Sequence, residues 1–421
     1  MAEIPKIGWR RIYYKGSYIP RIGLYLGEKQ EVNNILDEIE FLFLENKNKK
    51  IPNNLLKQKI VFYPNCKSKQ LANIVPGLIV EKDTNKEKIE EALVFFEKTF
   101  RKKLFFSCLN EIASWNDIEL LNYLWEYPIT GIYFAEKELN LIKPLLVLPP
   151  DKPAFIILKD IKNQIFKNLL WFLSSGIGLI FITLNVHKEA FTGIRNIIHF
   201  LKKHEKIIGG DPAQERVSVL IPSPTKKKSF TKILKDAENL ILASLSLGVA
   251  PRICTTSNPL CIDKQDIIFI PSSGFLNKGE TGLMLNKAYS GSKIFILGKI
   301  EFEEPTPKII TKAESNGELN WGKGKVFFMR ENFSSMGFSS LRKFLINIYR
   351  DSFINLLEID VKEGSIFRPW NTSKGWGMFV YIPEQPKIQI TLPNQKKVSI
   401  GKGSYLFVGD KINSDHIYFF E

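Results

Sequence analysis

The sequence predicts an α/β protein in three parts. These are a short (β/α)8-type barrel over residues 1–210, a flavodoxin-like α/β domain over 215–335 and a small C-terminal β-sandwich-like domain over 352–421. Strand-length apolar runs alternate with helix-length amphipathic runs through the first half, which is typical of a parallel α/β sheet. The alternation restarts after a polar linker, Asp211–Glu215. From residue 352 the pattern changes to short runs separated by turn residues, which indicates an all-β part.

Length and composition support several folded domains. A chain of 421 residues is too long for one ordinary core. Its hydrophobic content of 44% and aromatic content of 12% exclude global disorder. No apolar run approaches the roughly 18 residues that a membrane span needs, and the N-terminus has no apolar signal region. We therefore expect a cytoplasmic protein without membrane contact.

The cysteines predict neither metal nor disulfide chemistry. Cys66, Cys108, Cys254 and Cys261 show no CxxC spacing and no nearby histidine cluster. This argues against a metal site and a disulfide framework, and it favours a reducing compartment. The flavodoxin-like part also lacks a G-x-G-x-x-G motif and a Walker A loop. The sequence therefore predicts no metal and no cofactor.

The net charge of +15 suggests nucleic acid as a partner. The lysines are scattered, however, as in Lys47–Lys50 and Lys226–Lys228, and no recognition helix, RNP-like strand or Arg-rich motif stands out. We favour compositional bias or heat adaptation of a solvated surface. A basic nucleic-acid-associated protein stays an alternative.

Eight strand-like runs define the barrel, and several are continuously apolar, as expected when both faces of a strand are covered. They are Ile22–Leu26, Ile60–Tyr63, Gly77–Val80, Leu104–Leu109, Gly131–Phe134, Leu145–Leu148, Ala154–Leu158 and Gly178–Leu184. Helical patterns separate most of them: Glu31–Asn46, Lys86–Arg101, Asn116–Trp125, Ile161–Ser174 and Lys188–Lys206. The sixth and seventh runs are too close for a helical crossover, so one of them could lie outside the barrel, with Arg11–Lys15 as its replacement.

The second part reads as a doubly wound sheet. Its expected strands are Val217–Ile221, Arg252–Cys254, Asp266–Ile270, Lys293–Leu297 and Lys325–Met329, with helices at Thr231–Leu247 and Thr281–Tyr289. Gly248 is a good C-cap for the first helix. A bridging helix, Ser339–Asp351, leads to the last part. Its expected strands are Phe353–Val361, Gly377–Ile382, Lys387–Leu392, Lys397–Ile400 and Ser404–Val408.

The sharpest candidate site is Asn110-Glu111, at the carboxyl end of the buried run Leu104–Leu109. Strand ends of this kind form the active-site floor of a parallel barrel. A carboxylate beside an amide and near an aromatic, Trp115, suits acid/base chemistry on a sugar. His187, after the last barrel run, could line the same mouth. The alternatives are a charge at a helix N-terminus for Glu111, core packing for Trp115 and a surface role for His187.

The order of the three parts resembles the β-galactosidases of glycoside hydrolase family 42, which carry a trimerisation domain. The segments that carry the likeness are Arg195–Ile208, Val217–Ile221, Asp266–Ser273, Ser292–Gly298, Gly322–Phe327 and Ile366–Trp370. They resemble the helix that leaves the barrel, strands of the family's class I amidotransferase-like domain, and the start of its β-domain. Ser272-Ser273-Gly274 replaces a G-x-C-x-G nucleophile elbow, so glutaminase activity is not expected. The motifs are fold-level and say little about chemistry.

The resemblance implies a retaining glycoside hydrolase with a carbohydrate substrate and a homo-oligomeric assembly. In that clan the acid/base is a Glu after an Asn at the end of barrel strand four, which in the count above is Glu111. The nucleophile is a Glu that ends strand seven, where this chain has Asp160; Glu136 is the other candidate. Because Asp160 departs from the pattern, a second hypothesis is a catalytically inactive barrel that serves assembly or carbohydrate binding.

Overall fold

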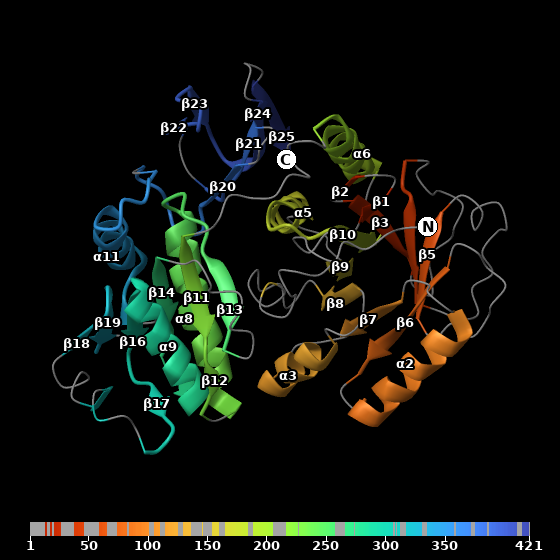
Figure 1. Ribbon diagram of the computed structural model, residues 1–421. Helices are drawn as coiled ribbons and strands as arrows, with labels where there is room; N and C mark the ends of the chain where they lie inside the picture. Colours follow the sequence, from red (N-terminus) through yellow and green to blue (C-terminus); the bar gives the residue numbers. More distant parts are fainter. Residues whose placement is uncertain are drawn as a thin grey trace. The chain divides into compact units, whose positions relative to one another are not determined.

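The computed structural model (Figure 1) describes most of the chain. The described residues are 13–14, 17–18, 21–26, 38–45, 59–64, 74–81, 84–100, 105–109, 114–124, 129–135, 145, 154–159, 165–183, 188–204, 216–225, 227–256, 266–272, 274–305, 308, 310–311, 317–330, 335–357, 359–371, 375–384, 387–410 and 415–420. The chain forms two compact units. The first holds residues 1–113 and 120–211, and the second holds 114–119 and 212–419.

The first unit contains a closed barrel, coloured red to yellow in Figure 1. Its strands among the described residues are β3 (Arg21–Leu26), β4 (Phe41–Leu44), β5 (Ile60–Pro64), β6 (Ile74–Val80), β7 (Phe106–Leu109), β8 (Ile129–Ala135), β9 (Ala154–Lys159) and β10 (Leu179–Thr183). Each pairs in parallel with the next along the chain, and β10 pairs with β3 to close the ring. The helices between strands include α2 (Lys86–Phe100), α3 (Trp115–Tyr123), α5 (Ile165–Ser174) and α6 (Lys188–Lys203). The predicted barrel is confirmed.

Two of the predicted barrel elements were wrong. Phe41–Leu44 was assigned to a helix over Glu31–Asn46, but it forms strand β4 with all four side chains buried. Leu145, predicted to start a strand, is helical. Within the proposed replacement strand, Tyr13–Tyr14 (β1) pairs with Ser17–Tyr18 (β2) in a separate two-stranded sheet. A short apolar run such as Phe-Leu-Phe-Leu fits both helical and strand spacing, so periodicity alone could not decide.

The barrel interior is filled by aromatic rings rather than open. Its buried cluster holds Tyr25, Phe41, Phe43, Phe62, Val75, Phe106, Cys108, Phe155, Ile157, Leu179 and Phe181. Ring centroids of Phe62 lie 5.2 Å from Phe181 and 5.3 Å from Phe106, in edge-on or tilted geometry. Such pairs add to the stabilisation that burial alone provides.

Three glycines make room for these rings. Gly23, Gly77 and Gly131 stand directly opposite Phe181, Phe106 and Phe155 on the neighbouring strands. A Cβ atom at each glycine would lie 2.5, 2.4 and 2.1 Å from the facing ring. The ring of each phenylalanine therefore occupies the space that a side chain on the glycine would need.

The second unit is built on a six-stranded sheet of order β13-β11-β14-β16-β19-β18, coloured green to blue in Figure 1. The parallel strands are β11 (Val217–Ile221), β13 (Arg252–Thr255), β14 (Ile267–Ile270), β16 (Lys293–Leu297) and β19 (Gly324–Met329), with β18 (Glu318–Trp321) antiparallel at the edge. Numbered along the chain, the parallel strands run 2-1-3-4-5, which is the flavodoxin-like order. The predicted doubly wound part is confirmed.

Three helices accompany this sheet. They are α8 (Lys227–Leu245), which packs on β11, α9 (Lys278–Ser290), which packs on β16 and β19, and α11 (Phe338–Arg350), which packs on α8. Asn277 and Glu280 form a capping box at the start of α9. Gly248 has φ 74°, as expected for the C-cap that follows α8.

The C-terminal part is a four-stranded sheet of β20 (Ile366–Asn371), β21 (Gly375–Ile382), β24 (Gly403–Asp410) and β25 (Asp415–Phe420), with a hairpin of β22 (Ile388–Thr391) and β23 (Lys397–Ile400). The predicted strand over Phe353–Val361 was wrong where residues are described. Phe353 instead closes α11, and the N–H groups of Phe353 and Ile354 donate to the carbonyls of Arg350 and Tyr349. The division of this unit into domains at 335 and 352 stays a prediction.

The cysteine prediction was wrong in one respect. Cys254 is disulfide-bonded, with a partner outside the described residues. Cys108 is free and buried in the barrel cluster, as expected, and burial raises the pKa of its thiol. In the described part of the chain, no helix is long and apolar enough to cross a membrane.

Candidate active site at the carboxyl rim of the barrel

Most of the predicted site residues lie outside the described part of the chain. They are Asn110, Glu111, Glu136, Asp160 and His187. Asn110, Glu136 and Asp160 directly follow described barrel strands in the sequence. Since all eight strands are parallel, their carboxyl ends share one rim, where barrel enzymes place their active sites.

The observed strand count changes the rank of the strand that precedes Glu111, the predicted acid/base. With β4 included, Leu104–Leu109 contributes the fifth strand, β7, and Glu111 follows that strand rather than the fourth. Glu136 follows the sixth strand, β8, and Asp160 directly follows the seventh, β9. The placement of Glu111 after strand four was therefore wrong, whereas that of Asp160 after strand seven holds.

The fourth strand, β6, is followed directly by a different carboxylate, Glu81. Its side chain is exposed. Its backbone N–H donates to the Thr84 hydroxyl at 3.0 Å, and its carbonyl accepts from the Thr84 N–H at 2.9 Å, which forms a tight turn before α2. The sequence alone gave Glu81 no assigned role, because the run Phe41–Leu44 was not counted as a strand. The signal was present, since Glu81 adjoins the predicted strand Gly77–Val80.

A second carboxylate on the rim is held by a tyrosine. Glu45 directly follows β4, and its N–H donates to the Leu26 carbonyl at 3.3 Å, which extends the parallel ladder by one residue. Its side chain accepts a hydrogen bond from the hydroxyl of Tyr25. Tyr25 is 1% exposed, and its ring stacks on Phe43 at 5.9 Å. The rim at strands one and two therefore carries a positioned carboxylate that sequence reasoning missed.

Trp115 is the described member of the predicted set, and it is 7% exposed. Its ring packs edge-on against Phe230 at 6.1 Å, and its indole N–H donates to Glu119 at 3.1 Å. Asp117 accepts from the N–H and hydroxyl of Ser114 at 2.7 and 3.1 Å, at the start of α3. These contacts match the core-packing alternative for Trp115 and leave little ring surface for stacking on a sugar.

The flavodoxin-like sheet has its own usual ligand position, outside the carboxyl ends of β11 and β14 where the strand order reverses. Here the segments that follow those strands, β12 (Ser223–Pro224) and β15 (Gly274–Leu276), pair with each other. A Cβ atom on Gly274 would lie 2.1 Å from the Pro222 ring. Ser272, 2% exposed, donates to buried Asp236 at 2.6 Å. The chain's own segments therefore cover this position.

No protein-family model matches the chain, and no curated protein matches it. Solved structures do. A catalytic mutant of the family 42 β-galactosidase Gan42B of G. stearothermophilus matches at 8% identity and a TM-score of 0.57, over 77% of this chain and 66% of that enzyme. The cold-adapted β-galactosidase of Rahnella sp. R3 matches at 8% identity and a TM-score of 0.63, over 96% and 100%. The β-galactosidase of Halorubrum lacusprofundi matches at 7% identity and a TM-score of 0.56, over 94% and 100%.

The chain has the fold of these β-galactosidases. The predicted class, a barrel followed by a flavodoxin-like part and a β-part, is thereby confirmed. Identities of 7–8% extend the likeness to the fold alone. The match to Gan42B spans just under two thirds of that enzyme's length. Among the described residues, no three His, Cys, Asp or Glu side chains gather as a metal-binding group.

Proposed function

We propose that this protein acts on carbohydrate as a retaining glycoside hydrolase at the carboxyl rim of its barrel. One observation supports this above the others. The barrel has the fold of β-galactosidases, and its fourth and seventh strands are each followed directly by an acidic residue, Glu81 and Asp160. These are the two strand ends at which the resembled family holds its catalytic pair.

In a retaining mechanism one carboxylate attacks the anomeric carbon and forms a glycosyl-enzyme. The second carboxyl group protonates the departing oxygen and then activates water, and the two groups stand about 5–5.5 Å apart. We assign the nucleophile to Asp160, with Glu136 as the alternative. The acid/base is Glu81 or Glu111. Asn110 and His187 would hydrogen-bond the sugar.

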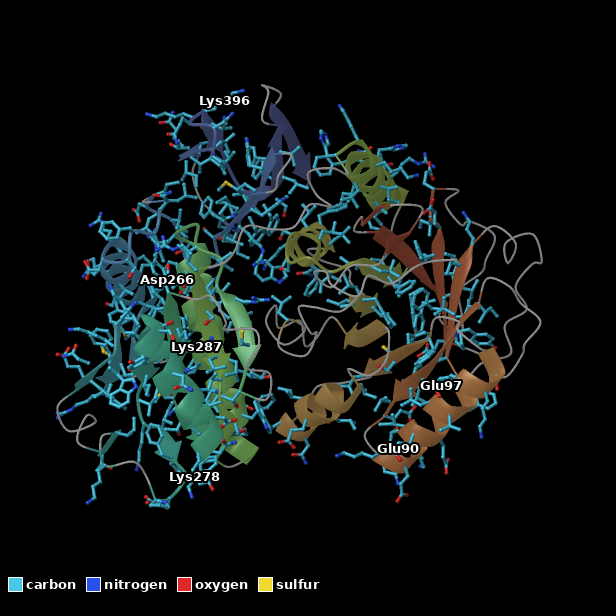
Figure 2. All side chains as sticks on the ribbon, in the orientation of Figure 1. Glu90, Glu97, Asp266, Lys278, Lys287 and Lys396 are labelled. Atoms are coloured by element: carbon cyan, nitrogen blue, oxygen red, sulfur yellow. The ribbon has the colours of Figure 1, made fainter. Side chains whose placement is uncertain are left out.

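A panel of aryl glycosides, with β-galactosides first, tests the proposal. We expect Asp160→Asn to lower kcat by about 10³-fold or more, because the covalent step is lost. An activated 2-fluoro glycoside should label Asp160, as located by peptide mass spectrometry. Glu97→Gln is the matched control, since Glu97 is an exposed carboxylate on helix α2 (Figure 2) and should leave kcat unchanged. No hydrolysis by the unaltered protein across the panel would contradict catalysis. A label on Glu136 would assign the role of nucleophile to Glu136 instead of Asp160.

A second candidate is a barrel without catalysis that serves assembly or carbohydrate binding. Two observations favour it: the engagement of Glu45 by Tyr25, and the covered ring of Trp115. Calorimetric binding of galactose and oligosaccharides without turnover would support it. Light scattering would test the homo-oligomer that the resemblance implies.

We also propose a cytoplasmic location for this protein. The disulfide at Cys254 removes the cysteine argument for a reducing compartment, although intracellular proteins of hyperthermophiles also carry disulfides.

A further inference from the structure

The β22–β23 hairpin of the C-terminal part has two faces of different character. Ile388, Ile390, Val398 and Ile400 pack into the core that also holds Phe367 and Phe407. Side chains alternate across a strand, so the other face carries the intervening residues. These are Gln389, Thr391, Lys397 and Ser399, of which Gln389 pairs with Ser399 and Thr391 with Lys397. The outward face is therefore polar along its whole length.

Lysines stand at both ends of the hairpin, and two of them, Lys387 and Lys397, have the register of its outward face. Lys387 precedes β22 and Lys402 follows β23, so both lie at the base of the hairpin, whereas Lys396 and Lys397 lie at its tip (Figure 2). All four are exposed. No Asp or Glu occurs between Glu384 and Asp410 in the sequence. Lys387, Lys397 and Lys402 form no ion pair with any described residue. Positive charge on the hairpin is therefore not neutralised within its own segment.

The backbone that carries these lysines is fixed. At the tip, the Leu392 N–H donates to the Lys396 carbonyl at 2.9 Å, and the Gln395 N–H donates to the Leu392 carbonyl at 2.8 Å. The Asn394 side chain accepts from the Lys396 N–H at 3.2 Å. At the base, the Tyr405 hydroxyl bonds the Gly401 backbone at 3.2 Å. The spacing between the two lysine pairs is thus set by the strands, and little order has to be gained on binding.

We propose that this face binds the phosphate backbone of double-stranded nucleic acid. Lys, Thr, Gln and Ser are side chains that contact phosphates without sequence specificity. A two-stranded ribbon has the width that enters or spans a groove of a duplex. The outward face carries no aromatic side chain among residues 387–402. Single strands and sugar rings are held largely by stacking on aromatic rings, so the face suits a duplex, whose bases are already stacked.

Fluorescence anisotropy with a duplex oligonucleotide of mixed sequence, measured across a NaCl series, tests the proposal. The unaltered protein should bind with log Kobs falling linearly against log[NaCl]. In the variant K387Q/K396Q/K397Q/K402Q we expect that slope to flatten by about 1 per lysine removed, and affinity near 0.1 M salt to fall roughly tenfold or more. Because all four side chains are exposed, the fold should be kept, as checked by circular dichroism; K397Q alone gives a milder variant.

The matched control is K88Q/K98Q/K202Q/K203Q, which removes four exposed lysines from α2 and α6 and changes the net charge equally. Its salt slope should equal that of the unaltered protein. If the slope of log Kobs against log[NaCl] flattened equally in both variants, net charge alone would drive binding. That result would overturn the proposal. So would an absence of duplex binding, or hairpin-dependent binding of heparin or a single strand in preference to the duplex.

Discussion

At the scale of single residues, the barrel depends on glycines that face aromatic rings. Phe155 fills the interior because its partner across the strands, Gly131, has no Cβ, and the same holds for Phe106 over Gly77. The glycine is not required by backbone conformation, since neither position has a positive φ. Its role is to leave space for a ring that would otherwise clash, so the pair acts as one packing unit.

Gly131→Ala should therefore destabilise the barrel. The added methyl would lie 2.1 Å from the Phe155 ring, and overpacking of this kind costs about 1–3 kcal/mol. Urea unfolding, followed by circular dichroism, measures the loss. Gly282→Ala is the control, because Gly282 lies inside helix α9 with no neighbouring atom within 4 Å of an added Cβ. That change should stabilise its helix by about 0.5–1 kcal/mol. An unchanged free energy of unfolding in Gly131→Ala would show that the Phe155 ring moves aside freely.

At the scale of elements, helices α8 and α11 are joined by a buried hydrogen bond. The hydroxyls of Ser244 and Tyr349 lie 2.7 Å apart, and Ser244 also donates to the Leu240 carbonyl at 2.8 Å. Tyr349 can then act as the donor to Ser244. Tyr349 is 0% exposed, and burial raises the pKa of its hydroxyl well above the ordinary value of 10.0. The neutral phenol is therefore the form that the folded protein holds.

This predicts a loss of stability in alkali. The folded state keeps the Tyr349 proton more tightly than the unfolded state, so its contribution is complete below pH 10 and declines as pH rises above that value. The slope is about 1.4 kcal/mol per pH unit for one such group. Urea unfolding at pH 8.5 and 10.7 compares the unaltered protein with Tyr349→Phe. The variant should lose about 1 kcal/mol at pH 8.5 and show a smaller decline between the two values. An equal decline in both would assign the effect to other groups.

Elements also show which parts of the fold the sequence could predict. Strands such as Leu179–Thr183 and Val217–Ile221 were found because they are apolar, bounded by turns and separated by clear helical patterns. Phe41–Leu44 was missed because its spacing also suits a helix that began upstream. The predicted strand at Phe353 failed for a different reason. Hydrogen bonds from Phe353 and Ile354 close α11, with Phe353 at φ 54°, a conformation that its residue type does not indicate.

At the scale of the whole molecule, one missed strand changed which residue follows the fourth barrel strand, from Glu111 to Glu81. The carboxyl rim could be predicted, because it depends on local sequence next to each strand. The seventh-strand position of Asp160 was right because two errors cancelled: β4 was omitted, and Leu145–Leu148 was counted as a strand. Rank around a closed barrel is a global property, and a single omission shifts every later strand by one. Contacts between distant residues, such as Tyr25 with Glu45 and Trp115 with Phe230, carry no local signal at all.

The corrected count makes a prediction that separates Glu81 from Glu111. If rank in the barrel decides the acid/base, Glu81→Gln should lower kcat by about 10²–10⁴-fold on substrates with poor leaving groups, and much less on dinitrophenyl glycosides, which need no protonation. Added azide should restore its rate and release a β-glycosyl azide, because a small anion can replace the missing base. Glu111→Gln then keeps most of its activity. If the local sequence Asn110-Glu111 decides instead, Glu111→Gln shows the lower kcat and the azide rescue, and Glu81→Gln keeps most of its activity. Loss in both without azide rescue in either would mean that neither residue is the acid/base. The strand order of the closed barrel favours the first outcome.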